Sequence, residues 1–153
     1  MNSIFNKELI FVVCRRWLEF VALTHVILGI LIFFMVPSNL ITAYVDSLLT
    51  SFNVIECTNE TCRELVYFLV RLFGPTIASW GILMWYLVRR ALLKKDTTAS
   101  NMLIAAVLIW FVLDTTLSMV SGILIHGVVN MVAFLSIVVP LMVSRYLNKD
   151  RAA

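Results

Sequence analysis

Residues 71–81 read RLFGPTIASWG, and this stretch indicates how the chain folds. It lies inside an apolar run from about Glu64 to Arg90, which is long enough to cross a bilayer. One helix face collects a charge and three small residues at spacings i, i+3, i+7 and i+10: Arg71, Gly74, Ala78 and Gly81. Small residues on one face are typical of close helix contact in a membrane. We therefore expect Arg71 to point into protein and this helix to be the packing centre of a membrane bundle.

Pro75 interrupts the same run. A proline has no N–H for the carbonyl four residues back, which here belongs to Arg71. A kink, a freed carbonyl and a charge therefore coincide on one turn, and this coincidence predicts a polar pocket inside the bundle.

The composition of the whole chain is that of a membrane protein. Of its 153 residues, 61% are hydrophobic and only 14% are charged, and the mean hydropathy is +0.97. A soluble domain would carry roughly 25% charged residues. The length allows one domain with about four spans, so the predicted fold is all-α, a polytopic four-helix membrane bundle. The net charge of +3 does not indicate a nucleic-acid partner, because the basic residues cluster at the ends of the predicted spans.

The apolar segments divide the chain in order. The predicted spans are about 17–36, 64–90, 101–121 and 126–147. Residues 1–16 carry too many charges to span and are expected to form an interfacial helix that leads into the first span. Residues 39–53 repeat apolar side chains at i, i+3, i+4 and i+7, which predicts an amphipathic helix on the outer surface or over the outer mouth of the bundle.

The basic residues predict the orientation. Three flanks are rich in Lys and Arg: the N-terminus, the loop after Arg89 and the C-terminus. The first loop holds only Arg63, and the third loop holds none. By the positive-inside rule both termini are cytoplasmic, and we expect an integral protein of a bacterial inner (cell) membrane.

A buried polar cluster is the main candidate for a site. Arg71 and Asp114 each lie seven residues from the outer end of their predicted spans, and therefore roughly 10 Å below the outer surface. Opposite charges at one depth predict an ion pair, which Ser118 and Asn130 are close enough in depth to complete. The pair could be purely structural, or it could mark a binding or transport site.

His25 and Glu19 in the first span are secondary candidates. They could relay protons or receive a quinone or a metal ion, but at six residues apart they share a helix face poorly. Alternatively, Glu19 pairs with Arg15 or Arg16, and His25 bonds to a neighbouring helix. No metal site and no cofactor are expected, because typical ligand spacings are absent.

Cys57 and Cys62 lie in one polar loop and are expected to form a disulfide if that loop is outside the cell. No catalytic motif such as GxSxG, HExxH or a P-loop occurs, so the sequence does not predict an enzyme.

The order of parts and the stretch RLFGPTIASWGILMWYLVRR, residues 71–90, are similar to the DoxX-like group of small four-helix membrane proteins. This resemblance implies an accessory membrane subunit. Some members of that group are associated with respiratory or thiol and sulfur redox systems. It carries over no functional residues.

Three functions remain open from the sequence. The first is a non-enzymatic accessory or interaction subunit of a membrane complex. The second is a small transporter or lipophilic-ligand binder that uses a buried Arg71–Asp114 pair, and the third is a membrane redox subunit. The expected partners are the lipid bilayer and a membrane protein or a second copy of the chain, and not nucleic acid.

Overall fold

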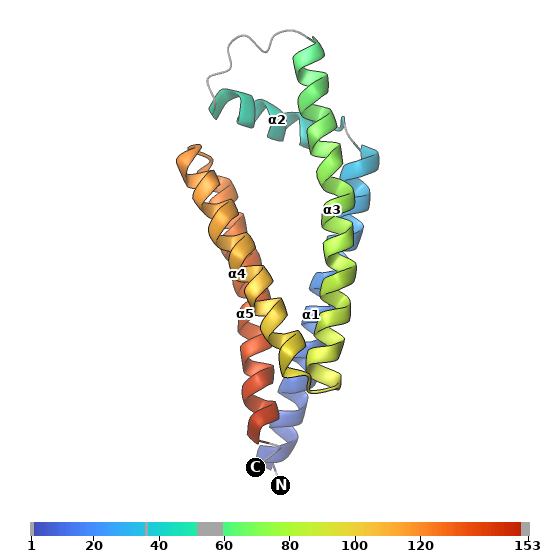
Figure 1. Ribbon diagram of the computed structural model, residues 1–153, viewed down its shortest axis with the longest axis vertical. Coiled ribbons are helices and arrows are strands. Elements are labelled where there is room, and N and C mark those ends of the chain that lie inside the picture. The colour runs from blue at the N-terminus through green and yellow to red at the C-terminus, as the bar shows by residue number, and fades with distance from the viewer. Residues whose placement is uncertain (1, 36, 52–59, 151–153) are drawn as a thin grey trace.

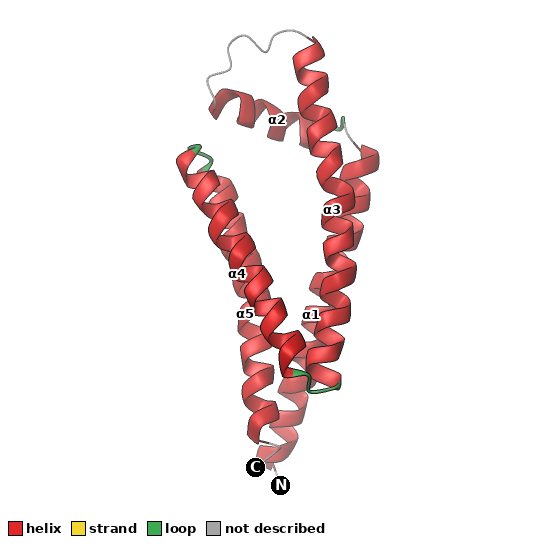
Figure 2. Cartoon of the chain, viewed as in Figure 1, coloured by secondary structure: helices red, strands yellow, loops and turns green. Residues whose placement is uncertain are grey.

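The structure is a computed structural model that describes residues 2–35, 37–51 and 60–150, and every element in these ranges is a helix (Figure 2). The helices are α1 Asn2–Met35, α2 Asn39–Ser51, α3 Glu60–Leu93, α4 Thr97–Val120 and α5 Leu124–Asp150. The predicted all-α class is confirmed.

Four of these helices are long and apolar enough to cross a membrane. They are Asn6–Met35, Glu60–Leu93, Thr97–Val120 and Leu124–Asn148. Their large apolar side chains are widely exposed, as Phe34 (75%) and Val120 (83%) illustrate. In water such a surface would be unstable, but in a bilayer lipid chains cover it. The prediction of a small multi-pass membrane protein is therefore confirmed by the length and composition of the helices.

The long helices form two arms (Figure 1). One arm is α1 packed along α3, and the other is α4 packed against α5. The arms meet near the end that holds both termini and diverge toward the other end, which α2 crosses. The most deeply buried apolar side chains form a single core shared by the four long helices, and they include Leu18, Met84, Leu103 and Leu141.

Glycine sets the contact between α1 and α3. A Cβ added at Gly29 would lie 2.4 Å from the carbonyl oxygen of Gly74 and 2.5 Å from the backbone nitrogen of Ala78. A Cβ at Gly81 would likewise meet the backbone of α1 at Ala22, 2.8 Å away. The predicted small-residue face is thus a backbone-to-backbone contact, as in other membrane helix pairs.

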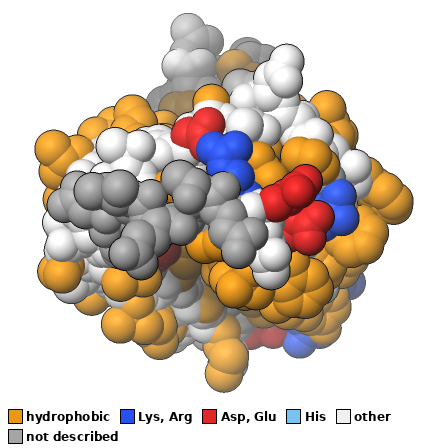
Figure 3. Space-filling model, turned by 90° about the horizontal axis from the view of Figure 1, so that it is seen from above, with side chains coloured by type: hydrophobic (Ala, Val, Ile, Leu, Met, Phe, Trp, Pro, Cys, Tyr) orange, Lys and Arg blue, Asp and Glu red, His pale blue; other side chains and the backbone are white. Residues whose placement is uncertain are grey.

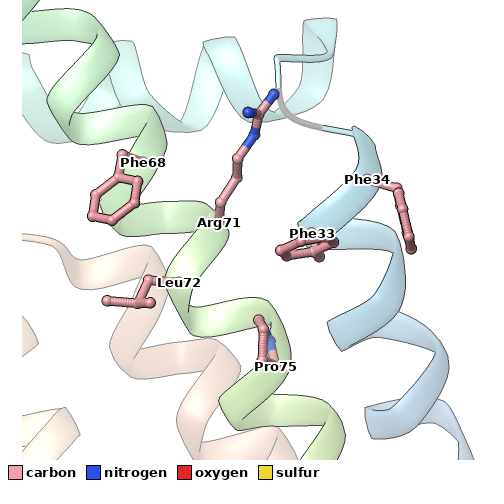
Figure 4. A pocket seen from close by; sticks show the side chains of 6 residues that line it. All are labelled: Phe33, Phe34, Phe68, Arg71, Leu72 and Pro75. Atoms are coloured by element: carbon pink, nitrogen blue, oxygen red, sulfur yellow. The ribbon is translucent and has the colours of Figure 1, made fainter.

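The Arg71 side chain does not point into the bundle, although it shares a helix face with the small residues that contact α1. The side chain is exposed and extends beyond the last glycine contact, toward the connection between α1 and α2 (Figure 4). The reason is that the close contact ends at Gly74 and Phe33, so the helices have no room for a guanidinium between them below that level.

Two predicted boundaries differ from the structure. Residues 2–35 form one continuous helix rather than an interfacial helix followed by a span, because no proline lies in this range and its first glycine is Gly29. The third loop is shorter than expected: α5 begins at Leu124, so His126 lies in its first turn. The helix α3 continues through Pro75.

The amphipathic segment is a helix, as predicted, and its bounds are those of α2. Val45 is fully buried, and Thr42 accepts a hydrogen bond from Tyr67 of α3 at 3.3 Å. Asp46 forms an ion pair with Arg63. Viewed from this end, charged side chains gather between hydrophobic ones (Figure 3).

Candidate functional site

Asp114 is the centre of a polar cluster between α4 and α5. Its Oδ2 accepts a hydrogen bond from Nδ2 of Asn130 at 2.7 Å and lies 3.2 Å from Nε2 of His126. His126 and Asn130 are four residues apart at the start of α5, so they share the helix face that α4 contacts. Asn130 is 2% exposed, which makes this amide a buried part of the helix contact.

Two hydroxyl side chains near the carboxylate, those of Ser118 and Thr115, bond to other groups. Ser118, which is buried, donates to the backbone carbonyl of Asp114 at 2.7 Å rather than to its carboxylate. Thr115 lies 3.4 Å from the Asn130 amide. The structure therefore joins the side chains of Asp114 and Asn130, whereas Ser118 bonds to the backbone of its own helix.

Arg71 belongs to a different site. It lines a pocket of about 440 Å³ between α1 and α3, together with Phe33, Phe34, Phe68, Leu72 and Pro75 (Figure 4). Among the described residues the side chains that contact the Asp114 carboxylate are those of His126 and Asn130, so the expected Arg71–Asp114 pair is not the arrangement found. Equal depth did not imply proximity, because α3 packs on α1 and diverges from α4 toward this end.

Tyr44 links α2 to the cluster. Its hydroxyl lies 3.3 Å from Nδ1 of His126, whose other nitrogen faces Asp114. Burial, followed by the charge of Asp114, raises the pKa of the Tyr44 phenol above its ordinary value. The phenol therefore stays protonated, and a neutral hydroxyl, an imidazole and a carboxylate form a hydrogen-bonded chain.

Sequence reasoning did not assign His126 and Tyr44 to the cluster. The spacing of His126 and Asn130, four residues apart, was the available signal for a shared face on α5. It was missed because the fourth span was expected to begin at about residue 126, which placed His126 at its edge, whereas α5 begins at Leu124. The sequence predicted a helix over residues 39–53 at the outer surface or outer mouth of the bundle, but it did not indicate that this helix would meet His126.

The secondary candidates, His25 and Glu19, have polar partners within their own helix. Nδ1 of His25 lies 2.7 Å from the carbonyl oxygen of Val21 in its own helix, and Glu19, which is 6% exposed, pairs with Arg16 at 3.4 Å. Within the described ranges, no group of three or more His, Cys, Asp or Glu side chains is arranged to hold a metal ion. Cys57 lies outside the described residues, so its disulfide with Cys62 stays a prediction.

Comparisons with protein-family models, with curated proteins and with solved structures find no match. The DoxX-like resemblance therefore stays a prediction, and function must be argued from the cluster itself.

The chemistry of the cluster suits hydrogen bonding within a membrane. Asp114 lies roughly 9 Å from the end of α4 at Val120, at about 1.5 Å per residue. The side chains of His126 and Asp114 are 31% and 33% exposed, so the chain covers them only in part. A partly covered carboxylate at this depth can accept hydrogen bonds from water or from another polypeptide.

Proposed function

We propose that this protein is a non-enzymatic accessory subunit of a membrane complex, and that the Asp114 cluster binds a transmembrane helix of its partner. One observation carries the proposal. Both contacts that described residues make with the Asp114 carboxylate go to Oδ2, so among the described residues Oδ1 has no partner and can accept a hydrogen bond from another polypeptide.

The membrane makes this incomplete coverage expensive. An aspartate costs about 2.5 kcal/mol at the centre of a span on insertion scales, which is an upper reference for Asp114 because it lies nearer to the end of α4. Polar side chains in spans usually face protein or a water-filled cavity. A partner helix that carries a donor such as Ser, Thr, Asn or Lys at the same depth would satisfy Oδ1 and exclude lipid from His126.

The second candidate function, a small transporter or a lipophilic-ligand binder built on an Arg71–Asp114 pair, is less favoured in that form because the two residues lie in different sites. A redox subunit has no specific support among the described residues.

Purification from native membranes in a mild detergent tests the proposal. The wild-type chain is expected to retain one membrane protein in stoichiometric amount. The double variant Asp114→Asn/His126→Gln keeps the side-chain shapes but removes both titratable groups, and it is expected to lose that protein.

Thr116→Val is the matched control. Thr116 is exposed and lies roughly 200° around α4 from Asp114, on the opposite face. This variant is expected to retain the partner. A double variant that keeps the partner as well as the wild type does, or a wild-type chain that purifies alone, would contradict the proposal.

A further inference from the structure

The pocket beside Arg71 combines one cation with an apolar lining. Four of its residues come from one face of α3, at spacings i, i+3, i+4 and i+7: Phe68, Arg71, Leu72 and Pro75. Phe33 and Phe34 of α1 complete the lining; Phe33 points toward α3, and Phe34 lies on the other side of α1 (Figure 4). The volume of about 440 Å³ lies within the range typical of small-ligand sites.

The packing of α1 explains where the pocket opens. Below it, the glycine contact brings the two backbones together and leaves no space, since a Cβ at Gly74 would lie 2.6 Å from the Gly29 carbonyl oxygen. The close contact extends up to Phe33, whose backbone nitrogen would lie 2.9 Å from a Cβ at Gly74. The pocket therefore begins where the close contact ends.

The pocket lies at a membrane boundary. Phe33 and Phe34 are in the last turn of α1, which ends at Met35. We expect the aromatic part of the pocket to lie near the edge of the hydrocarbon, because α1 ends within two residues of it. A long basic side chain at such a position extends toward the head groups, as that of Arg71 does.

We propose that this pocket binds an anionic phospholipid, with the phosphate on Arg71 and an acyl chain across Phe33, Phe34 and Phe68. Charge complementarity selects this occupant, because among the described residues that line the pocket Arg71 is the charged one. A guanidinium has five N–H donors and holds phosphate bidentately. Arg71 also interacts within the chain, and its donor set is large enough to serve both contacts. The inference does not depend on the proposed partner of Asp114.

Lipid titration followed by native mass spectrometry tests this site. Detergent-solubilised protein is titrated with dioleoylphosphatidylglycerol, dioleoylphosphatidylcholine or oleate. The wild type is expected to bind phosphatidylglycerol more tightly than phosphatidylcholine. Arg71→Gln is expected to weaken phosphatidylglycerol binding at least about tenfold, since hydrogen bonds to charged groups are strong.

A second variant probes the apolar wall. The Phe34 side chain is 75% exposed and contributes little to the fold, so Phe34→Ala is expected to fold normally and to weaken binding roughly fivefold. Arg89→Gln is the matched control, because Arg89 is an exposed arginine near the opposite end of the same helix. It is expected to leave this affinity unchanged.

Several outcomes overturn the proposal. One is equal binding of phosphatidylglycerol by the wild type and Arg71→Gln. Another is an equal loss of phosphatidylglycerol affinity in Arg71→Gln and Arg89→Gln. Equal affinity for phosphatidylcholine also counts against it. If oleate alone shows the dependence on Arg71, the occupant is a free fatty acid and not a phospholipid.

Discussion

The Asp114 carboxylate takes its hydrogen bonds from the first two turns of α5, whereas depth in the membrane had suggested Arg71 as its partner. A double-mutant cycle separates the two arrangements, with the free energy of unfolding measured by denaturant titration in micelles. For Asp114→Ala and Asn130→Ala we expect a coupling of about 0.5–3 kcal/mol, because the two side chains bond directly at 2.7 Å. For Asp114→Ala and Arg71→Ala we expect additivity within about 0.5 kcal/mol. Strong coupling of Arg71 to Asp114 would restore the pair expected from the sequence.

The residues of the candidate site could be predicted from the sequence only in part. Asp114, Ser118 and Asn130 were found because polar side chains are conspicuous in apolar spans. Arg71 lines a different pocket in the structure, and the sequence did not indicate this because it gives the depth of a residue along its own helix but not which helix lies beside it. His126 was not assigned to the cluster because the fourth span was expected to begin at about residue 126, two residues after the observed start of α5.

At the scale of the helix pair, the α1–α3 contact depends on the absence of a side chain at Gly29. Gly29→Ala would place Cβ against the backbone of α3, which cannot move as a side-chain tip can. We expect a loss of roughly 1–3 kcal/mol in the free energy of unfolding, as for other overpacked contacts. Gly127→Ala is the matched control, because its Cβ would meet only the flexible end of Met119. Equal losses in both variants would show that the clash at Gly29 is not what limits the contact.

The start of α4 predicts an acid-dependent stability. Asp96 caps this helix by accepting from the Ala99 backbone N–H at 3.1 Å, and that bond, followed by the Arg90 guanidinium, lowers the pKa of its carboxyl. A depressed folded-state pKa stabilises the protein above the unfolded-state value, and this contribution disappears as the pH falls through the folded-state value. Thermal unfolding is therefore expected to depend less on pH below about 4 in Asp96→Asn than in the wild type. Asparagine is itself a good N-cap, so stability at neutral pH should change little. An unchanged acid dependence would show that the cap does not titrate.

Most of the fold was predictable at the scale of the element. A bilayer requires about 20 apolar residues for each crossing, so length and hydropathy predicted four spans. The spacing of apolar side chains in residues 39–53 predicted α2, because it places them on one face of a helix. The pairing of helices into two arms was not predictable, because Gly29, Gly74 and Gly81 identify a contact face without naming its partner.

At the scale of the whole molecule, the positions of the basic residues still predict the orientation. Both termini lie at one end of the structure, as an even number of spans requires (Figure 1). Reporter fusions after Asn59, Asp96 and Lys149 are expected to read outside, inside and inside. An inside signal after Asn59 would reverse the assignment of α2 and of the Arg71 pocket to the outer leaflet.

The central claim is that the Asp114 cluster is the point where a second membrane protein binds. Photo-crosslinking in intact membranes tests it most directly. A benzophenone side chain replaces Leu117, which is 66% exposed and close to Asp114 on α4, and Thr116 serves as the control position on the opposite face. We expect one discrete adduct with a different membrane protein from position 117, lost when Asp114→Asn/His126→Gln is added, and no such adduct from position 116. Adducts with lipid or with a second copy alone, or the same protein captured from both positions, would contradict the claim.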